Sequence, residues 1–376
     1  MIRVGITGQN GFIGSHLLRH LNLSNGIEAI NFERSFFYDA QKLDAFVNDC
    51  DVIVHLAAIN RCENLNELYD TNVNLIHKLL ESCERKQVFP HIIFSSSTQE
   101  NNNSHYGKSK AQGHNLLKCF SEKHKSASTV FVIPNVFGEF CRPNYNSVVA
   151  TFAHTFINGH TPSITTNNRV PFIYVASLCQ MIIDKIKYVH NVQIKNYECI
   201  NVKEDFMLQV YELLQLFKYF KDTYIDKGII PQLKNKNEVN LFNTFRSYID
   251  IKSHFPVLLE KHCDERGLFV ETMKLGIGGQ ISFSTTKPCV TRGNHFHTRK
   301  IERFTVIRGK AKISLRKIGN NETIDFFIDG DNPAYIDMPV WFTHNISNVG
   351  DEDLYTQFWI NEYYNPDDAD TYYEKV

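Results

Sequence analysis

The segment from Ser95 to Lys110 holds side chains that could bind an oxygen atom and exchange a proton with it. Tyr106 and Lys110 stand four residues apart in a segment with helical spacing, so both side chains should share one helix face. An ammonium beside a phenol favours the phenolate, and we therefore expect Lys110 to lower the pKa of Tyr106. A hydroxyl from Ser95-Ser96-Ser97-Thr98 would hydrogen-bond the same substrate oxygen, so together with a hydride donor these groups could interconvert a ketone and an alcohol.

A second group of reactive residues lies in the C-terminal third of the chain. His295 and His297 are two residues apart, so both should face the same side of a strand, and Glu302 and His344 follow. Three imidazoles and a carboxylate are suitable ligands for zinc or another divalent ion. If the ion takes three protein ligands, His297 would instead act as a base. A metal-free pocket of hydrogen-bonded histidines is the alternative.

A glycine motif near the N-terminus indicates a nucleotide site. Gly8, Gly11 and Gly14 follow a short apolar strand pattern and open a helical one. Glycines at this spacing permit a tight turn and a close approach of the main chain to a pyrophosphate, which then lies at the helix N-terminus. The sequence therefore predicts a bound dinucleotide.

The end of the second predicted strand should decide which dinucleotide binds. A carboxylate at Glu33 would bind a ribose diol and favour NAD, whereas a guanidinium at Arg34 would bind a ribose phosphate and favour NADP. We expect NADPH.

Strand and helix patterns alternate along the first 250 residues, which predicts βαβ units and a doubly wound parallel sheet. The predicted strands are Arg3–Thr7, Glu28–Phe32, Asp51–Leu56, His91–Ser95 and Thr129–Pro134, and the predicted helices are Phe12–Leu23, Leu65–Arg85 and Tyr106–Lys123. Beyond about residue 255 the helical period is absent, and short strands with glycine turns predict an antiparallel barrel. We expect domains at residues 1–250 and 251–376.

Composition narrows the partners and the compartment. The 376 residues include 40 Lys and Arg against 41 Asp and Glu, a net charge of −1 that does not favour nucleic acid. No apolar run is long enough for a membrane span, and no signal-peptide pattern begins the chain. The 9 cysteines are odd in number and form no Cys-x-x-Cys pair, so we expect a reducing, cytoplasmic setting.

Residues 1–250 resemble the extended short-chain dehydrogenases/reductases. The glycine motif and the Tyr106/Lys110 pair carry this resemblance, with matches at His55-Leu-Ala-Ala58, Asn72 and Pro134-Asn-Val-Phe-Gly138. It implies that Tyr106 is the acid/base, that Lys110 also holds the cofactor ribose and that Ser97 orients the ketone. The implied cofactor-binding residues are Gly8, Gly11, Phe12, Ile13, Gly14, Arg34, His55, Ala57, Tyr106 and Lys110.

Thr98 and Gln99 depart from the family's dehydratases, which carry adjacent Asp and Glu after the catalytic hydroxyl. Glu100 is the only acid in this stretch. A hydroxyl and an amide are poor proton-transfer groups, so dehydration of a sugar is disfavoured.

Residues 255–376 resemble a cupin, and Asp264–Gly267 and Arg292-Gly293 are similar to segments of deoxysugar-nucleotide epimerases built on that barrel. A hydrogen beside a ketone is acidic, so C3 of a 4-keto sugar can be inverted. Reduction at C4 then removes that acidity and fixes the configuration.

Four further segments match one family along the whole chain, namely Pro143-Asn-Tyr-Asn-Ser-Val148, Lys287-Pro288, Gly293-Asn-His295 and Pro339-x-x-x-Thr-His-Asn345. With them, the whole chain resembles the bifunctional capsular-polysaccharide synthesis enzymes, which join these two domains. The resemblance implies C3 epimerisation and NADPH-dependent C4 reduction of a UDP-linked 4-keto-6-deoxy-N-acetylhexosamine, a homodimer and zinc in the cupin. We place substrate binding at Asn135, Arg142 and Asn144. The alternative is an NAD-dependent sugar-nucleotide 4-epimerase with a non-catalytic cupin module for dimerisation or sugar binding.

Overall fold

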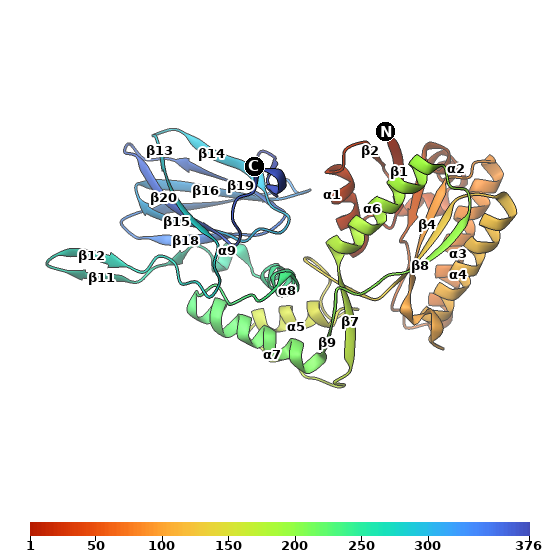
Figure 1. The fold of residues 1–376 in the computed structure, drawn as a ribbon, viewed down its shortest axis with the longest axis horizontal. Coiled ribbons are helices and arrows are strands. Elements are labelled where there is room, and N and C mark those ends of the chain that lie inside the picture. Colours follow the sequence, from red (N-terminus) through yellow and green to blue (C-terminus); the bar gives the residue numbers. More distant parts are fainter. The chain divides into compact units, whose positions relative to one another are not determined.

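The computed structural model describes residues 1–376, which pack as two compact units (Figure 1). The first unit consists of Met1–Thr151 and Thr166–Val210, and the second of Phe152–Thr165 and Tyr211–Val376. By packing, residues 211–250 therefore group with the C-terminal strands. The division into two catalytic domains after residue 250 stays a prediction.

Six strands form the main sheet of the first unit, in the order β2-β1-β3-β4-β5-β8. Every neighbouring pair is parallel, and β4 and β5 are buried along their whole length, as expected for strands covered on both faces. The strands are β1 (Ile2–Thr7), β2 (Ile27–Ile30), β3 (Val52–His55), β4 (His91–Ser97), β5 (Ser128–Ile133) and β8 (Tyr197–Asn201). This confirms the predicted doubly wound fold.

The strand order creates a switch point beside β1. The chain leaves β1 to form β2 on one side, and then returns to form β3 on the other. In open α/β sheets, ligands bind outside the carboxyl ends of the strands at such a point. The loops that follow β1 and β3 are therefore positioned to form a nucleotide site.

Helices cover both faces of this sheet (Figure 1). On one face α1 (Phe12–Asn22) packs against α6 (Val175–Val192), and on the other α3 (Leu65–Lys86) packs between α2 (Ala40–Asp49) and α4 (His105–His124). The apolar side chains beneath α2, α3 and α4 form one buried cluster, which includes Phe46, Ile53, Leu79, Phe94 and Leu117. A smaller sheet of β6 (Asn135–Phe137), β7 (Arg169–Tyr174) and β9 (Phe206–Gln209) completes the unit.

Two antiparallel five-stranded sheets form the barrel of the second unit, in the orders β10-β18-β15-β20-β13 and β17-β16-β19-β14-β21. Ala311, Ile313 and Leu315 on β16 are buried at alternate positions, as expected for a strand with one face towards a core. The strands of the first sheet are β10 (Val257–Leu258), β13 (Gln280–Thr286), β15 (Glu302–Arg308), β18 (Ala334–Met338) and β20 (Leu354–Ile360). Those of the second are β14 (Thr291–Phe296), β16 (Lys310–Lys317), β17 (Thr323–Asp329), β19 (Phe342–Asn348) and β21 (Tyr372–Tyr373). The predicted cupin-like fold is confirmed.

Short elements surround the barrel strands. The strands β11 (Lys261–Asp264) and β12 (Gly267–Val270) form a separate hairpin. The helical elements are α5 (Val148–Ile157), which spans a boundary between the units, α7 (Val210–Phe220), the π-helical turn η3 (Lys221–Ile225), α8 (Lys236–Arg246) and α9 (Ile251–His254). No helix of the chain is long and apolar enough to cross a membrane.

A buried ion pair joins the helical segment to the barrel. Arg303 on β15 and Asp337 on β18 are 1% and 0% exposed, and the Arg303 Nε donates to the Asp337 carboxylate over 2.6 Å. The Tyr224 hydroxyl of η3 donates to the same carboxylate over 2.6 Å, and Arg303 donates to the main-chain oxygen of Gly228. Breaking a buried pair of this kind typically costs about 3–5 kcal/mol. These contacts account for the grouping of residues 211–250 with the barrel.

Candidate active sites

The loop after β1 is shaped to hold a phosphate. Gly8 has a φ of 81°, in the left-handed region, and a Cβ there would lie 2.8 Å from the main-chain nitrogen of Ala57. The helix α1 begins at Phe12, and no side chain caps it at Gly11, so its first N–H groups remain available to an anion. These observations fit a dinucleotide pyrophosphate. The predicted residues of this loop lie together, namely Gly8, Gly11, Phe12, Ile13 and Gly14.

Thr7 joins the carboxyl ends of β1 and β3. Its hydroxyl oxygen lies 2.8 Å from the His55 Nδ1 and accepts a hydrogen bond from the Ala57 N–H over 3.4 Å. Burial, with a smaller effect of the Lys110 charge, lowers the pKa of His55 to about 3, so this imidazole is neutral. Because the His55 ring is enclosed, only the main chain of His55 could contact a cofactor. Ala57 lies directly against the glycine loop.

The two candidates for the adenosine ribose lie in the turn after β2. Gln9 of the glycine loop donates to the Asn31 side chain over 2.8 Å, which ties this turn to the phosphate loop. Glu33 and Arg34 are both exposed. Glu33 accepts a hydrogen bond from the Ser35 hydroxyl over 3.2 Å, whereas no protein group engages the Arg34 side chain. The Arg34 donors are therefore available to a ligand.

Lys110 is buried and donates from Nζ to the main-chain oxygen of Ser95 over 2.8 Å. Burial lowers the pKa of Lys110 to about 8. Its ammonium lies 5.7 Å from the ring centre of Tyr106. Burial, and to a smaller extent the nearby Tyr145 phenol, raises the pKa of Tyr106 to about 12. The expected lowering of the Tyr106 pKa is therefore wrong, because burial disfavours the phenolate.

Ser97 ends β4 and caps the short turn η2 (Thr98–Asn101), where its oxygen accepts from the Gln99 N–H over 3.2 Å. The hydroxyl hydrogen of Ser97 thus remains available to a substrate oxygen. Gly107 lets α4 approach this turn, since a Cβ there would lie 2.1 Å from the main-chain oxygen of Gln99. The close approach brings the helix turn that carries Tyr106 against the Ser97–Gln99 turn.

Glu100 is part of a separate side-chain network. Its carboxylate accepts a hydrogen bond from the Ser96 hydroxyl and lies 3.2 Å from the His114 Nδ1, while the other ring nitrogen of His114 contacts the Tyr197 hydroxyl. The acid that follows Ser97 is therefore already paired. That dehydration is disfavoured at this site stays a prediction.

The residues predicted to bind substrate have different environments. Asn135 donates to the main-chain oxygen of Pro171 over 3.2 Å, and Asn144 has a φ of 55° in an exposed turn. The Arg142 guanidinium lies 5.2 Å from the Tyr145 ring centre, and the Arg61 guanidinium lies 5.9 Å from the same ring. Sequence reasoning missed Arg61. Its closeness to the His55-Leu-Ala-Ala58 match was the available signal.

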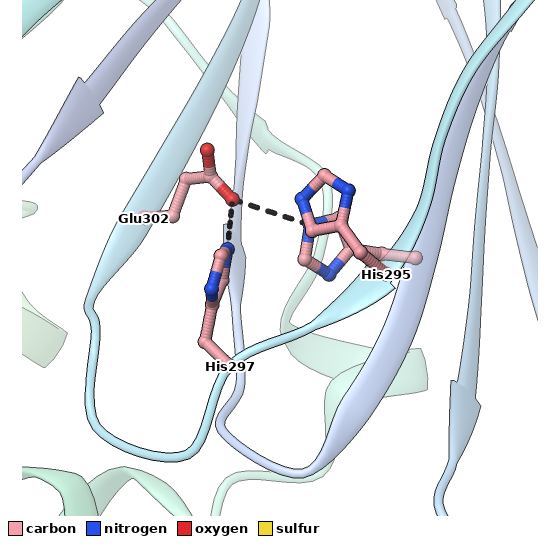
Figure 2. Close-up of side chains that lie close together, drawn as sticks. His295, His297 and Glu302 are labelled. Atoms are coloured by element: carbon pink, nitrogen blue, oxygen red, sulfur yellow. Dashed lines mark hydrogen bonds and ion pairs between the residues drawn. The ribbon is translucent and has the colours of Figure 1, made fainter. Parts of the chain in front are cut away.

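Four side chains converge in the barrel. His295 on β14 is the cross-strand partner of His344 on β19, Glu302 begins β15, and His297 lies one residue beyond the end of β14. The ligand atoms of the four all lie within 4.8 Å of one another, and Figure 2 shows Glu302 and the labelled histidines turned towards a common point. The structure thus brings together all four predicted ligands.

The hydrogen bonds of this cluster fit a cation. The Nδ1 atoms of His297 and His344 lie 2.6 and 3.2 Å from the main-chain oxygens of Asp370 and Phe342. A carbonyl oxygen only accepts, so each of these Nδ1 atoms carries a proton. Both Nε2 atoms lie 3.2 Å from the same oxygen of Glu302, and the Nε2 of His344 forms no hydrogen bond. The Nε2 of His297 can donate to Glu302, and a divalent ion that displaced this proton would find imidazole nitrogens and a carboxylate close together.

The electrostatics of the cluster agree with this arrangement. Burial, together with His344 and His297, lowers the pKa of His295 to about 4. Burial opposes ionisation of Glu302, but His297 and His344 outweigh it and hold the pKa of that carboxyl well below its usual range. Burial opposes protonation of His297, but its contact with Glu302 outweighs this effect and raises the pKa of His297, so a metal that binds there would release a proton.

Two family matches cover most of the chain. Residues 4–197 match the NAD dependent epimerase/dehydratase family, and residues 262–372 match the polysaccharide biosynthesis C-terminal domain. The capsular polysaccharide assembling protein CapF from Staphylococcus aureus matches over 100% of both chains, with 32% identity and a TM-score of 0.62. The chain belongs to the CapF family.

Other relatives agree with this assignment. A UDP-2-acetamido-2,6-beta-L-arabino-hexul-4-ose reductase from Pseudomonas aeruginosa is 31% identical over 99% of this chain and 98% of its own length. The spore coat polysaccharide biosynthesis protein SpsL from Bacillus subtilis is 28% identical over 30% of this chain and 81% of its own length. This CapF-family chain is therefore an enzyme of the nicotinamide-dependent epimerase/dehydratase type.

Proposed function

We propose that the protein is a bifunctional UDP-sugar enzyme. The barrel epimerises C3 of a UDP-4-keto-6-deoxy-N-acetylhexosamine, and the first unit then reduces the C4 ketone with NADPH to UDP-N-acetyl-6-deoxy-L-talosamine. This product would serve capsular or O-antigen polysaccharide synthesis as a precursor of N-acetyl-L-fucosamine.

One observation carries the proposal, namely the presence of two chemically different sites in one chain. Ser97, Tyr106 and Lys110 follow a nucleotide-binding loop, and the barrel encloses a histidine and carboxylate cluster. The full-length reductase relative acts on a hexul-4-ose by its name, which supports a keto sugar as the substrate.

The properties of Tyr106 favour reduction. A pKa of about 12 keeps the phenol protonated, and a protonated phenol is the form that donates to the oxygen of a reduced ketone. Ser97 holds that oxygen with its hydroxyl hydrogen, and Lys110 binds the cofactor ribose. NADPH supplies the hydride when it is bound by the glycine loop and Arg34.

The barrel residues would act on the proton at C3. His295, Glu302 and His344, with His297, hold a divalent ion that we propose to be zinc, and such an ion would draw electron density from a ketone oxygen. If the ion keeps three protein ligands, His297 is instead the base that removes the C3 proton. The ketone must still be present at this stage, which places epimerisation before reduction.

Arg142 is the proposed contact for the UDP diphosphate, together with Asn135 and Asn144 for the rest of the substrate. Arg61 joins this set because it flanks the same Tyr145 ring as Arg142, and Tyr145 lies close enough to Tyr106 to affect its pKa. Arginine forks suit phosphate oxygens. We also propose a homodimer and a cytoplasmic location, the latter supported by 9 cysteines without a disulfide.

The alternative remains an NAD-dependent 4-epimerase with a non-catalytic barrel. Such an enzyme must first oxidise the C4 alcohol, which requires Tyr106 to accept a proton. The raised pKa of Tyr106 opposes a high resting population of that accepting form, whereas it suits a proton donor.

The decisive experiment measures NADPH oxidation on a UDP-4-keto-6-deoxy-N-acetylhexosamine, with the C3 and C4 configurations of the product read by NMR. In deuterated water, a product inverted at C3 and labelled with solvent deuterium there is expected. NADPH consumption without deuterium at C3 would contradict the proposed epimerase activity. No NADPH consumption would contradict the proposed reductase activity.

A further inference from the structure

The C-terminal segment contacts the strands and the loop that carry the metal cluster. The strand β21 pairs with the end of β14, where Tyr373 is the cross-strand partner of His295. Next to His344, the Thr343 hydroxyl donates to the main-chain oxygen of Glu374. The last residues of the chain therefore lie beside two of the proposed ligands, although they supply no ligand themselves.

The same segment organises the loop between His297 and Glu302. The Asp370 carboxylate accepts hydrogen bonds from the main-chain N–H groups of residues 298, 299 and 300, each over 3.0 Å. It also accepts one from the Thr298 hydroxyl over 2.6 Å, and Asn361 accepts from the N–H of residue 301 over 2.8 Å. Every N–H group of residues 298–301 is thus held by a side chain from residues 361–370.

Asp370 also acts on His297 through its main chain. Its carbonyl oxygen lies 2.6 Å from the Nδ1 of His297, which places the proton on Nδ1 and leaves Nε2 to face Glu302. Asp370 has a φ of 40°, in the left-handed region, and is 5% exposed. Backbone strain of this kind persists where surrounding contacts enforce it. The conformation lets one residue direct its carboxylate to the loop and its carbonyl to the imidazole.

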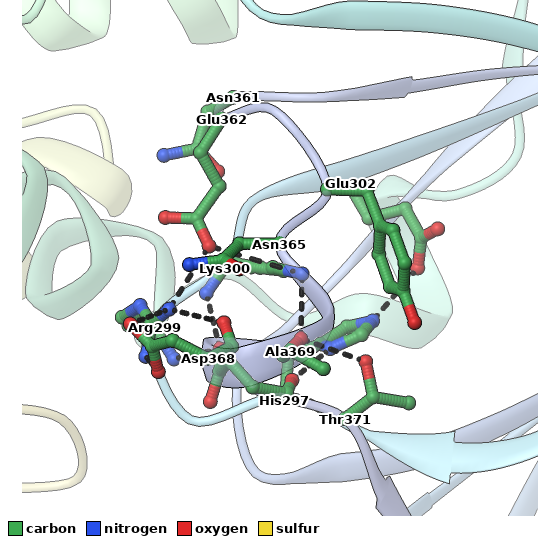
Figure 3. A network of polar contacts seen from close by, with 12 residues as sticks. His297, Arg299, Lys300, Glu302, Asn361, Glu362, Asn365, Asp368, Ala369 and Thr371 are labelled. Atoms are coloured by element: carbon green, nitrogen blue, oxygen red, sulfur yellow. Dashed lines mark hydrogen bonds and ion pairs between the residues drawn. The ribbon is translucent and has the colours of Figure 1, made fainter.

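Side chains reinforce the attachment (Figure 3). The Lys300 Nζ, which is almost fully buried, donates to the main-chain oxygen of Ala369 over 2.6 Å. Arg299 pairs with Asp368 and Glu362 over 2.9 and 3.1 Å. These contacts join the loop to the C-terminal segment outside the cluster itself.

We propose that Asp370 is the positioning residue of the barrel metal centre, holding the His297–Glu302 loop with its carboxylate and the His297 ring with its carbonyl. This inference rests on the proposed metal site and adds a residue outside the ligand set. It makes the end of the chain, which is far from the motif in sequence, a determinant of metal affinity.

The test compares Asp370→Ala with Asp368→Ala in the full-length protein. Asp368 is a matched control because it lies in the same segment, its side chain is 65% exposed, and its carboxylate bonds only to the Arg299 side chain. Zn²⁺ affinity is measured by competition with a chromogenic chelator. Outer residues that orient ligands typically contribute roughly 10–100-fold in metal affinity. We expect a loss in that range for Asp370→Ala and less than about twofold for the control.

A second readout follows the ring of His297 directly. In ¹⁵N-histidine-labelled, metal-free protein, at a pH alkaline enough for the His297 ring to be neutral, we expect Nδ1 to carry the proton in the wild type and in Asp368→Ala, and mixed tautomers in Asp370→Ala. A general loss of stability would lower the melting temperature without changing the tautomer. Equal Zn²⁺ affinities of the two variants, or an unchanged His297 tautomer in Asp370→Ala, would overturn the proposal.

Two further outcomes are distinguishable. If Asp370→Ala does not fold, Asp370→Asn replaces it, and wild-type affinity in that folded variant overturns the proposal because the amide removes two acceptor sites. If the wild type itself binds no Zn²⁺, the metal part of the proposed function fails, and the His297 tautomer alone then decides the role of Asp370.

Discussion

The nucleotide loop is formed mainly by the main chain, whereas the barrel cluster is formed by side chains. In the first unit, main-chain geometry dominates: a left-handed Gly8, an uncapped helix start and the ends of parallel strands. In the barrel, side chains from β14, β15 and β19 converge, and the loop between β14 and β15 is held by Asp370. The first kind of site follows from local sequence, whereas the second depends on contacts between distant segments.

Tyr106→Phe tests the side chain of the first unit that is proposed to donate the proton during reduction. Loss of a positioned proton donor should reduce NADPH oxidation by about 10²–10⁴-fold. Deuterium exchange at C3 should persist, because the proposed epimerase site lies in the barrel and does not include Tyr106. Tyr38→Phe, at a tyrosine 73% exposed, is the control. Equal loss of exchange and reduction would argue against two separate sites.

Asp337→Ala tests how far the second unit depends on contacts between distant segments, because it removes a buried charge that pairs with Arg303. The Arg303 guanidinium would remain buried without its carboxylate, which should lower the free energy of unfolding by about 3–5 kcal/mol. Thermal unfolding of this variant and of Asp331→Ala, at an exposed turn residue, measures the effect. Similar stabilities of the two variants would show that the pair is not needed to hold residues 211–250.

Arg34→Ala examines whether a side chain adds specificity to the main-chain nucleotide site. Hydrogen bonds to charged groups contribute about 1.5–3 kcal/mol, so the KM for NADPH should rise by about tenfold or more while the KM for NADH changes little. Steady-state kinetics with both cofactors measure this. Glu33→Gln should leave the NADPH value unchanged. The reverse pattern, with NADH affected by Glu33→Gln, would support the NAD-dependent alternative.

The pH dependence of reduction concerns Lys110, the buried cation of the first unit. Lys110 is charged below its pKa of about 8 and neutral above it, so reduction should be constant below about pH 7 and decline as pH rises through 8. The decline should approach tenfold per pH unit. In Lys110→Arg the side chain stays charged, so the decline in rate above pH 8 should disappear, even if the rate itself is lower. The same decline in both proteins would show that a group other than Lys110 causes it.

Local sequence patterns were sufficient to predict many helices and strands of the first unit. The helix predicted at Leu65–Arg85 is α3 (Leu65–Lys86), and the Tyr106–Lys123 helix is α4 (His105–His124). The pKa of Tyr106 was not predictable, because it depends on burial by segments distant in sequence. His297 lies outside its expected strand yet faces Glu302, because Asp370 turns the loop there, and no spacing rule connects residues 297 and 370.

The attachment of Tyr224 and Gly228 to Arg303 and Asp337 bears on how the protein should be divided for experiments. A fragment that starts at residue 251 would lose both of these partners and leave polar groups of the barrel wall without them. One that starts at Tyr211 would retain them. Expression trials of the C-terminal half should therefore include the two preceding helices, and gene fusions that exchange barrels between relatives should cross over before α7.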